Sequence, residues 1–186
     1  MPIRIGGRPD HGFDQPLGLL SDCHRRIESF LDQLIAISER ATKRPLSASE
    51  RPQLDAALTY FATAAPMHTA DEEDSLFPRL RASGDPQAIA AVAAIARLES
   101  DHQEADAHHR AVDALVRGWM ANDRIDDDDR RSLGDHLSAL QRIYRQHIAV
   151  EDRELFPAAG RVLATDQISA IGREMADRRS TRRRQV

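Results

Sequence analysis

Hydrophobic residues recur at spacings of three and four along four long stretches of the chain. This period matches one face of an α-helix, so each stretch is predicted to form an amphipathic helix. No stretch shows the strict alternation of hydrophobic and polar residues that is typical of a half-buried strand. The predicted helices run from about Pro16 to Ala41, from about Ser49 to the turn at residues 83–86, from about Pro86 to Met120 and from about Asp129 to Pro157.

The connections between these helices are short, which favours an all-α, up-down-up-down four-helix bundle. A segment from about Asp166 to Met175 is predicted as a short C-terminal helix that packs as an extra element before a basic tail. We expect a single domain over residues 1–186, with the bundle core at about 17–157 and a frayed, flexible tail at about 176–186.

Pro66, Pro78 and Pro157 bear on the course of the predicted helices. Pro66 lies inside the second helix, where its missing N–H should bend the helix without ending it. Pro78 and Pro157 each follow a Leu-Phe pair. We expect the two Leu-Phe-Pro segments to close one end of the bundle, with proline ending each helix.

Composition narrows the class of protein. Hydrophobic residues make up 41% of the 186 residues, which is enough for one substantial core, and only 4% of the residues are aromatic. The single cysteine, Cys23, excludes an intramolecular disulfide and a thiolate cluster supplied by one chain. No stretch approaches the roughly 18 apolar residues of a membrane span, and no secretory pattern is visible, so we expect a cytoplasmic protein with no membrane partner.

The charge is unevenly distributed. The formal net charge is −4, yet five of the last nine residues are arginines. Short basic ends are common on solvated chain termini. We therefore expect no nucleic-acid partner, and no motif predicts an oligomeric state.

The two halves of the chain carry the same short motif. His68-Thr-Ala-Asp-Glu-Glu-Asp-Ser-Leu-Phe-Pro and His147-Ile-Ala-Val-Glu-Asp-Arg-Glu-Leu-Phe-Pro share His, Glu, Leu, Phe and Pro at identical spacing, 79 residues apart. Upstream, His24 and His102 each follow a leucine by four residues and lie 78 residues apart. This pattern predicts a duplicated helical hairpin whose halves face each other across a pseudo-twofold axis.

The spacing within this motif suits a metal site. A histidine and a glutamate four residues apart lie on one face of a helix, about 6 Å apart along its axis, so both can point into the bundle. Buried carboxylates and imidazoles without partners would be strongly destabilising, and a bound metal removes this penalty. A donor set of nitrogen and oxygen without sulfur is typical of non-haem iron.

One His helix and one His-x-x-x-Glu helix per half resemble the hemerythrin-like (HHE cation-binding) family, over about residues 17–157. Ferritin-like bundles differ, because they use Glu-x-x-His and further glutamates. The resemblance implies a four-helix bundle around two iron ions that share a bridging oxo or hydroxo group. The ligands it implies are His24 and His68 on one iron, His102 and His147 on the other, and Glu72 and Glu151 as bridges.

The chain departs from oxygen-carrying hemerythrins, which have His-x-x-x-His on the third helix and His-x-x-x-x-Asp on the fourth. Here Asp106 lies four residues after His102, and we expect it to be a seventh ligand. A carboxylate in place of an imidazole adds negative charge at the metal, which favours the ferric state and disfavours reversible oxygen carriage. His109, Tyr60, Tyr144 or a water molecule could instead fill this position.

Two functions match this pattern. In the first, a non-haem di-iron protein binds or reacts with O2, peroxide or nitric oxide at an open iron position. In the second, an iron-binding module serves storage or sensing, and its metal occupancy controls an interaction with a partner. No nucleotide-binding loop or nucleophile motif is present, so the sequence assigns no catalytic residue.

Overall fold

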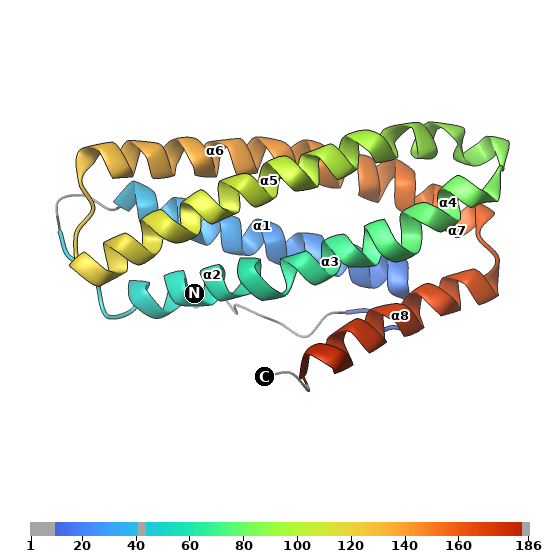
Figure 1. The fold of residues 1–186 in the computed structure, drawn as a ribbon, viewed down its shortest axis with the longest axis horizontal. Helices are drawn as coiled ribbons and strands as arrows, with labels where there is room; N and C mark the ends of the chain where they lie inside the picture. Colours follow the sequence, from blue (N-terminus) through green and yellow to red (C-terminus); the bar gives the residue numbers. More distant parts are fainter. Residues whose placement is uncertain (1–9, 41–43, 184–186) are drawn as a thin grey trace.

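The computed structural model describes residues 10–40 and 44–183, where all regular structure is helical. Four long helical rods form the predicted bundle, and consecutive rods run in alternating directions along its long axis (Figure 1). The elements of the first two rods are α1 (Pro16–Arg40), then α2 (Glu50–Thr63), α3 (Ala65–Asp71), the π-helical η1 (Glu72–Leu76) and α4 (Phe77–Ser83). The other two rods contain the 3₁₀ turn η2 (Pro86–Ala88) and α5 (Ile89–Asn122), then α6 (Asp127–Val150), the π-helical η3 (Glu151–Leu155) and α7 (Phe156–Val162). Within the described ranges, no helix combines the length and apolarity needed to cross a membrane.

Pro66 interrupts the second rod without ending it, as predicted. The single residue Ala64 separates α2 from α3, and its N–H donates to the Tyr60 carbonyl at 2.8 Å. The His68 N–H in turn donates to the Ala64 carbonyl at 3.2 Å, so helical hydrogen bonding resumes at once. The interruption therefore lies one turn before His68 and leaves the rod continuous.

The prediction that Pro78 and Pro157 end their helices is wrong. Both prolines lie in the first turn of a following helix, α4 and α7 respectively. The residue before each proline donates its N–H to the carbonyl five residues earlier, which is the π register. This wider turn shifts the helical hydrogen bonds by one residue. Proline, which has no N–H to donate, can therefore follow the turn while the rod continues.

The hydrophobic core has two parts, separated along the bundle axis by a layer of buried polar side chains. One part lies around Ile27, Leu34 and Trp119, and the other lies around Leu20, Phe77 and Leu155. The Leu-Phe pairs of the repeat belong to the second part, so their side chains are core residues on one side of the polar layer. Each rod carries its repeat histidine at the boundary between the two parts.

The C-terminal helix is longer than predicted. The sequence suggested a short helix at about Asp166–Met175 and a frayed tail at about 176–186, whereas α8 extends over Thr165–Arg183. This helix packs against α1 and α3, along the lower side of the bundle in Figure 1. Residues 184–186 of the expected tail lie outside the described residues.

Two arginines of the expected tail explain why it is helical. The Asp71 side chain is fully buried, and its carboxylate lies 2.8 Å from the Arg178 guanidinium and 2.7 Å from the Arg179 guanidinium. Arg178 also donates to Ser75 Oγ at 2.7 Å. These contacts replace the hydration that the carboxylate loses on burial. The segment beyond residue 175 is therefore held on the bundle by a buried partner that lies about 100 residues away in sequence.

The backbone before α1 also packs closely against α8. A Cβ atom at Gly172 would lie 1.9 Å from the Phe13 carbonyl oxygen, so glycine permits this close approach of two backbones. The Arg179 guanidinium lies over the Phe13 ring, 5.5 Å from its centroid. The N-terminal segment and α8 thus hold each other against the bundle.

Candidate metal centre

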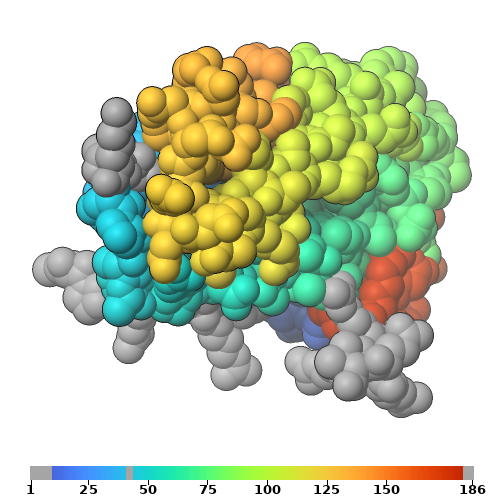
Figure 2. Space-filling view, turned by 60° about the vertical axis from the view of Figure 1, so that its left-hand side comes forward, coloured from blue at the N-terminus to red at the C-terminus, as the bar shows by residue number. Residues whose placement is uncertain are grey.

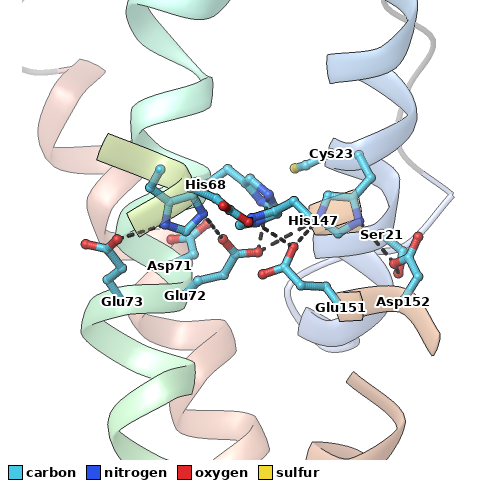
Figure 3. A network of polar contacts seen from close by, with 12 residues as sticks. Ser21, Cys23, His68, Asp71, Glu72, Glu73, His147, Glu151 and Asp152 are labelled. Carbon is cyan, nitrogen blue, oxygen red and sulfur yellow. Dashed lines mark hydrogen bonds and ion pairs between the residues drawn. The ribbon is translucent and has the colours of Figure 1, made fainter. Parts of the chain in front are cut away.

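Each rod contributes one histidine to the buried polar layer, and the second and fourth rods also contribute a glutamate. The residues are His24 (α1), His68 (α3), Glu72 (start of η1), His102 (α5), His147 (α6) and Glu151 (start of η3). All six side chains are at most 10% exposed, and both glutamates are fully buried. Figure 3 labels His68, Glu72, His147 and Glu151, whose side chains converge between the rods.

Short distances join the imidazole nitrogens to the two carboxylates. Carboxylate oxygens of Glu72 lie 3.2 Å from His68 Nε2 and 3.3 Å from His102 Nε2, and Glu151 Oε2 lies 3.1 Å from Nε2 of both His24 and His147. Each glutamate therefore contacts one histidine from its own half of the repeat and one from the other half. The pseudo-twofold arrangement predicted from the repeat is realised in these contacts.

The six residues form two groups of four donors that share both glutamates. The groups are His24, His68, Glu72 and Glu151, and Glu72, His102, His147 and Glu151, each with one donor atom per residue within 4.8 Å of the others. Two cations bridged by two carboxylates need this kind of donor set. The structure thus brings together all six residues that the repeat singled out.

The hydrogen bonding of these residues also fits a cation. Several polar atoms of the centre are buried and have no hydrogen-bond partner in the part of the chain that the structure describes. They are both carboxylate oxygens of Glu72, both carboxylate oxygens of Glu151, and Nε2 of His24 and of His102. Buried carboxylates without partners are strongly destabilising. Metal ions placed between the two glutamates would satisfy these lone pairs together.

Protonation couples to this site. Burial and the charge of Glu151 raise the pKa of Glu72 to about 7. Burial alone would lower the pKa of His24, but the carboxylates of Asp152 and Glu151 outweigh it and raise that pKa to about 10. Metal ligation requires the opposite states, an ionised carboxylate and a neutral imidazole. Metal uptake at neutral pH should therefore release protons.

Two carboxylates orient histidines of the centre from outside. Asp152 lies 3.0 Å from His24 Nδ1, and Glu73 lies 2.8 Å from His102 Nδ1. A carboxylate in this position holds the proton on Nδ1 and leaves the Nε2 lone pair for a metal. Ser21 donates to Asp152 at 2.8 Å and fixes that carboxylate in turn.

Asp152 was not among the predicted residues, although the repeat contained the signal. An acidic residue directly follows each repeat glutamate, Glu73 after Glu72 and Asp152 after Glu151. In a regular α-helix the next side chain points about 100° away, which favours either a solvated position or a role in supporting a ligand from outside. Because each glutamate begins a π turn, the next side chain is redirected, and it reaches the histidine of the other half.

Asp106 does not lie among the donors, contrary to the expectation that it is a seventh ligand. Its side chain is 63% exposed, and its carboxylate pairs with Arg110 one turn further along α5. The residues by which α5 faces the bundle are Leu98, His102, Ala105, His109, Val112, Val116 and Trp119, which alternate at spacings of three and four. Asp106 lies one residue off this seam and is therefore turned towards the surface.

Three further side chains were candidates for the seventh position, and they lie in two different places. His109 Nε2 and the Tyr144 hydroxyl lie 2.8 Å apart, and both residues line a cavity of about 220 Å³ that the four histidines also line. Tyr60 instead donates its hydroxyl to the Cys23 carbonyl at 3.3 Å. His109 and Tyr144 thus share a cavity with the donor histidines while bonding to each other.

We predict that His109 makes the fold sensitive to acid. Burial lowers the pKa of His109 to about 4, below the usual value of about 6.5 for an unfolded chain. The folded state then binds fewer protons, so this contribution is present above pH 6.5 and is lost as the pH falls towards 4, by up to about 3 kcal/mol. Urea unfolding of chelator-treated protein between pH 7.5 and 4 should show a smaller pH dependence for His109→Gln. Equal pH dependence in both proteins would contradict the prediction.

Comparison with known proteins agrees with this geometry. The model of the hemerythrin HHE cation-binding domain matches residues 15–159. A protein of Haemophilus influenzae that is described as uncharacterized is 27% identical over 173 residues, which cover 91% of this chain and 93% of that protein. The chain therefore belongs to the hemerythrin HHE cation-binding domain family.

Proposed function

We propose that this protein is a non-haem di-iron protein whose centre binds or reacts with O2, peroxide or nitric oxide. The observation that carries the proposal is the pair of four-donor groups that share Glu72 and Glu151. Imidazole nitrogen together with carboxylate oxygen, without thiolate, matches iron better than softer or harder cations. A cytoplasmic location and a single domain over residues 1–186 remain part of this proposal.

The donor count leaves room for a small ligand. Two histidines and one oxygen from each glutamate supply four donors per ion, fewer than the six of octahedral coordination, even when a bridging oxo or hydroxo group is added. The four histidines line the adjoining cavity, whereas neither glutamate does. A ligand would therefore approach from the histidine side of the centre.

The chain's own residues would prepare the site in three ways. Asp152 and Glu73 hold two histidines in the tautomer that presents Nε2. Ile27 and Phe61 line the cavity and limit access of water to the donors. The Tyr144 hydroxyl, paired with His109, offers a hydrogen bond in the same cavity. An iron pair, when bound, supplies redox and Lewis-acid chemistry next to these groups.

The second candidate, an iron-dependent storage or sensing module, is favoured by one specific contact. Arg178 and Arg179 of α8 bind the carboxylate of Asp71, which directly precedes Glu72. Metal binding at Glu72 and docking of α8 thus involve adjacent residues of the chain. In this candidate, metal occupancy would control how α8 is presented to a partner.

Metal analysis of protein purified without added metal tests the proposal. We expect about two iron ions per chain, as the paired donor groups require. A bridged ferric pair should absorb in the near-ultraviolet, and azide or peroxide should change this absorption if a coordination position is open. Zinc in place of iron, or one ion per chain, would contradict the di-iron proposal. Iron with an absorption that ignores azide and peroxide would favour the storage or sensing module.

A further inference from the structure

Two cavities lie next to each other, an inner one lined by residues of all four rods and an outer one between the second rod and α5. The inner one, of about 220 Å³, adjoins the four histidines and has an apolar wall that includes Ile27, Ala105 and Ile148. The outer one, of about 360 Å³, is lined by Leu58, Ala62 and Val112. The side of the bundle where the surfaces of α5 and α2 meet is visible in Figure 2.

The two cavities share four lining residues, and these define the neck between them. They are Phe61, Pro66, Asp106 and His109. The rings of Phe61 and His109 stack with centroids 4.2 Å apart and an angle of 25° between their planes. Pro66 lies just after the interruption of the second rod. The neck thus combines a stacked aromatic pair with the interruption of the rod that carries Phe61.

The inner cavity is larger than a diatomic molecule or hydrogen peroxide requires. A water molecule takes about 30 Å³ of liquid volume, and a cavity of about 150 Å³ accommodates benzene. The volume beside the histidines therefore fits a molecule with an organic body. Its largely apolar wall would favour an apolar body, because burial of apolar surface drives such binding.

Apart from the four histidines of the centre, the charged side chains around the cavities are paired, which favours a neutral ligand. In the inner cavity, Tyr144 and His109 bond to each other, and the tyrosine oxygen retains a free acceptor position. At the outer cavity, Asp106 pairs with Arg110 and Arg117 pairs with Asp113, so the charges at this mouth neutralise each other. The mouth therefore has no strong electrostatic field that would attract an ion.

We propose that the inner cavity binds a small neutral organic molecule that carries one hydroxyl or hydroperoxyl group. The ligand enters from the outer cavity past the Phe61–His109 pair and places its polar group against Tyr144. This inference deepens the proposed function, because it names the class of molecule that reaches the histidine side of the centre. It concerns binding alone and assigns no reaction.

Phenol is a suitable probe, since it combines an apolar ring with a single hydroxyl group. We expect ligand-observed saturation-transfer NMR on the protein as purified to show saturable binding of phenol. Ala105→Leu adds side-chain volume inside the cavity and should weaken binding at least tenfold, and Ala65→Leu, from the opposite wall, should do the same. Ala107→Leu, at an exposed position of α5, should leave binding unchanged. Circular dichroism would verify that each variant is folded.

A second comparison, between two probe molecules, tests the role of the Tyr144 hydroxyl. Tyr144→Phe should weaken binding of phenol several-fold and leave binding of benzene unchanged. Absence of saturable phenol binding, or binding that persists in both cavity-filling variants, would overturn the inference. Equal effects of Tyr144→Phe on phenol and benzene would overturn the assignment of Tyr144. Iron content measured on the same samples tests the proposed function separately, so the two can fail independently.

Discussion

Replacement of Glu151 by alanine is expected to lower the iron content from about two ions per chain to less than one. Glu151 is fully buried and belongs to both four-donor groups, so its loss removes one donor from each ion. The contacts of its Oε2 atom with His24 and His147 at 3.1 Å come from two different rods. Because the carboxylate connects both halves of the centre, we expect cooperative loss of both ions, measured as metal per chain after gel filtration.

Glu154→Ala is the matched control for this prediction. Glu154 lies in the same π-helical segment, η3, but its side chain is exposed. The control variant should retain the iron content of the natural sequence. Retention of two iron ions in folded Glu151→Ala would show that the shared carboxylates do not hold the metals. This result would contradict the di-iron proposal.

The double replacement of Arg178 and Arg179 by alanine should destabilise the protein by about 3–5 kcal/mol, the range typical of a buried charge that loses its partners. Asp71 is fully buried, while the two arginines are 23% and 22% exposed. Without them, the Asp71 carboxylate would lose both cationic partners in a site closed to water. Urea unfolding at pH 7 measures this loss.

A double-mutant comparison separates the buried pair from the general loss of charge. Arg173→Ala, at an exposed position of the same helix, should change stability by less than about 0.5 kcal/mol. Adding Asp71→Asn to the double variant should recover part of the lost stability, because the uncompensated charge disappears. A loss below about 1 kcal/mol in the double variant would show that the arginines do not stabilise Asp71. A single unfolding transition would support the proposal that α8 and the bundle form one domain.

The convergence of the four histidines and two glutamates could be predicted because the information is local and duplicated. His68 with Glu72, and His147 with Glu151, lie on one face of a helix by their spacing alone. The repetition of this spacing 79 residues later indicated that the two faces meet. The expectation for Asp106 used the same spacing on a single helix without a repeat. In the structure Asp106 is exposed, because α5 packs against the bundle through the adjacent positions Ala105 and His109.

The sequence by itself determined the four rods, the interruption at Pro66 and the meeting of the repeat histidines and glutamates inside the bundle, since helical periodicity and an internal repeat are properties of the chain. Only the tertiary structure decided the π turns at Glu72 and Glu151, the support of His24 by Asp152, and the docking of α8 on Asp71. The contacts among these features join residues that lie far apart in the chain. The π turns shift the helical hydrogen bonds so that such residues can meet. Their energies come from burial and charge pairing between rods, which no pattern within one rod records.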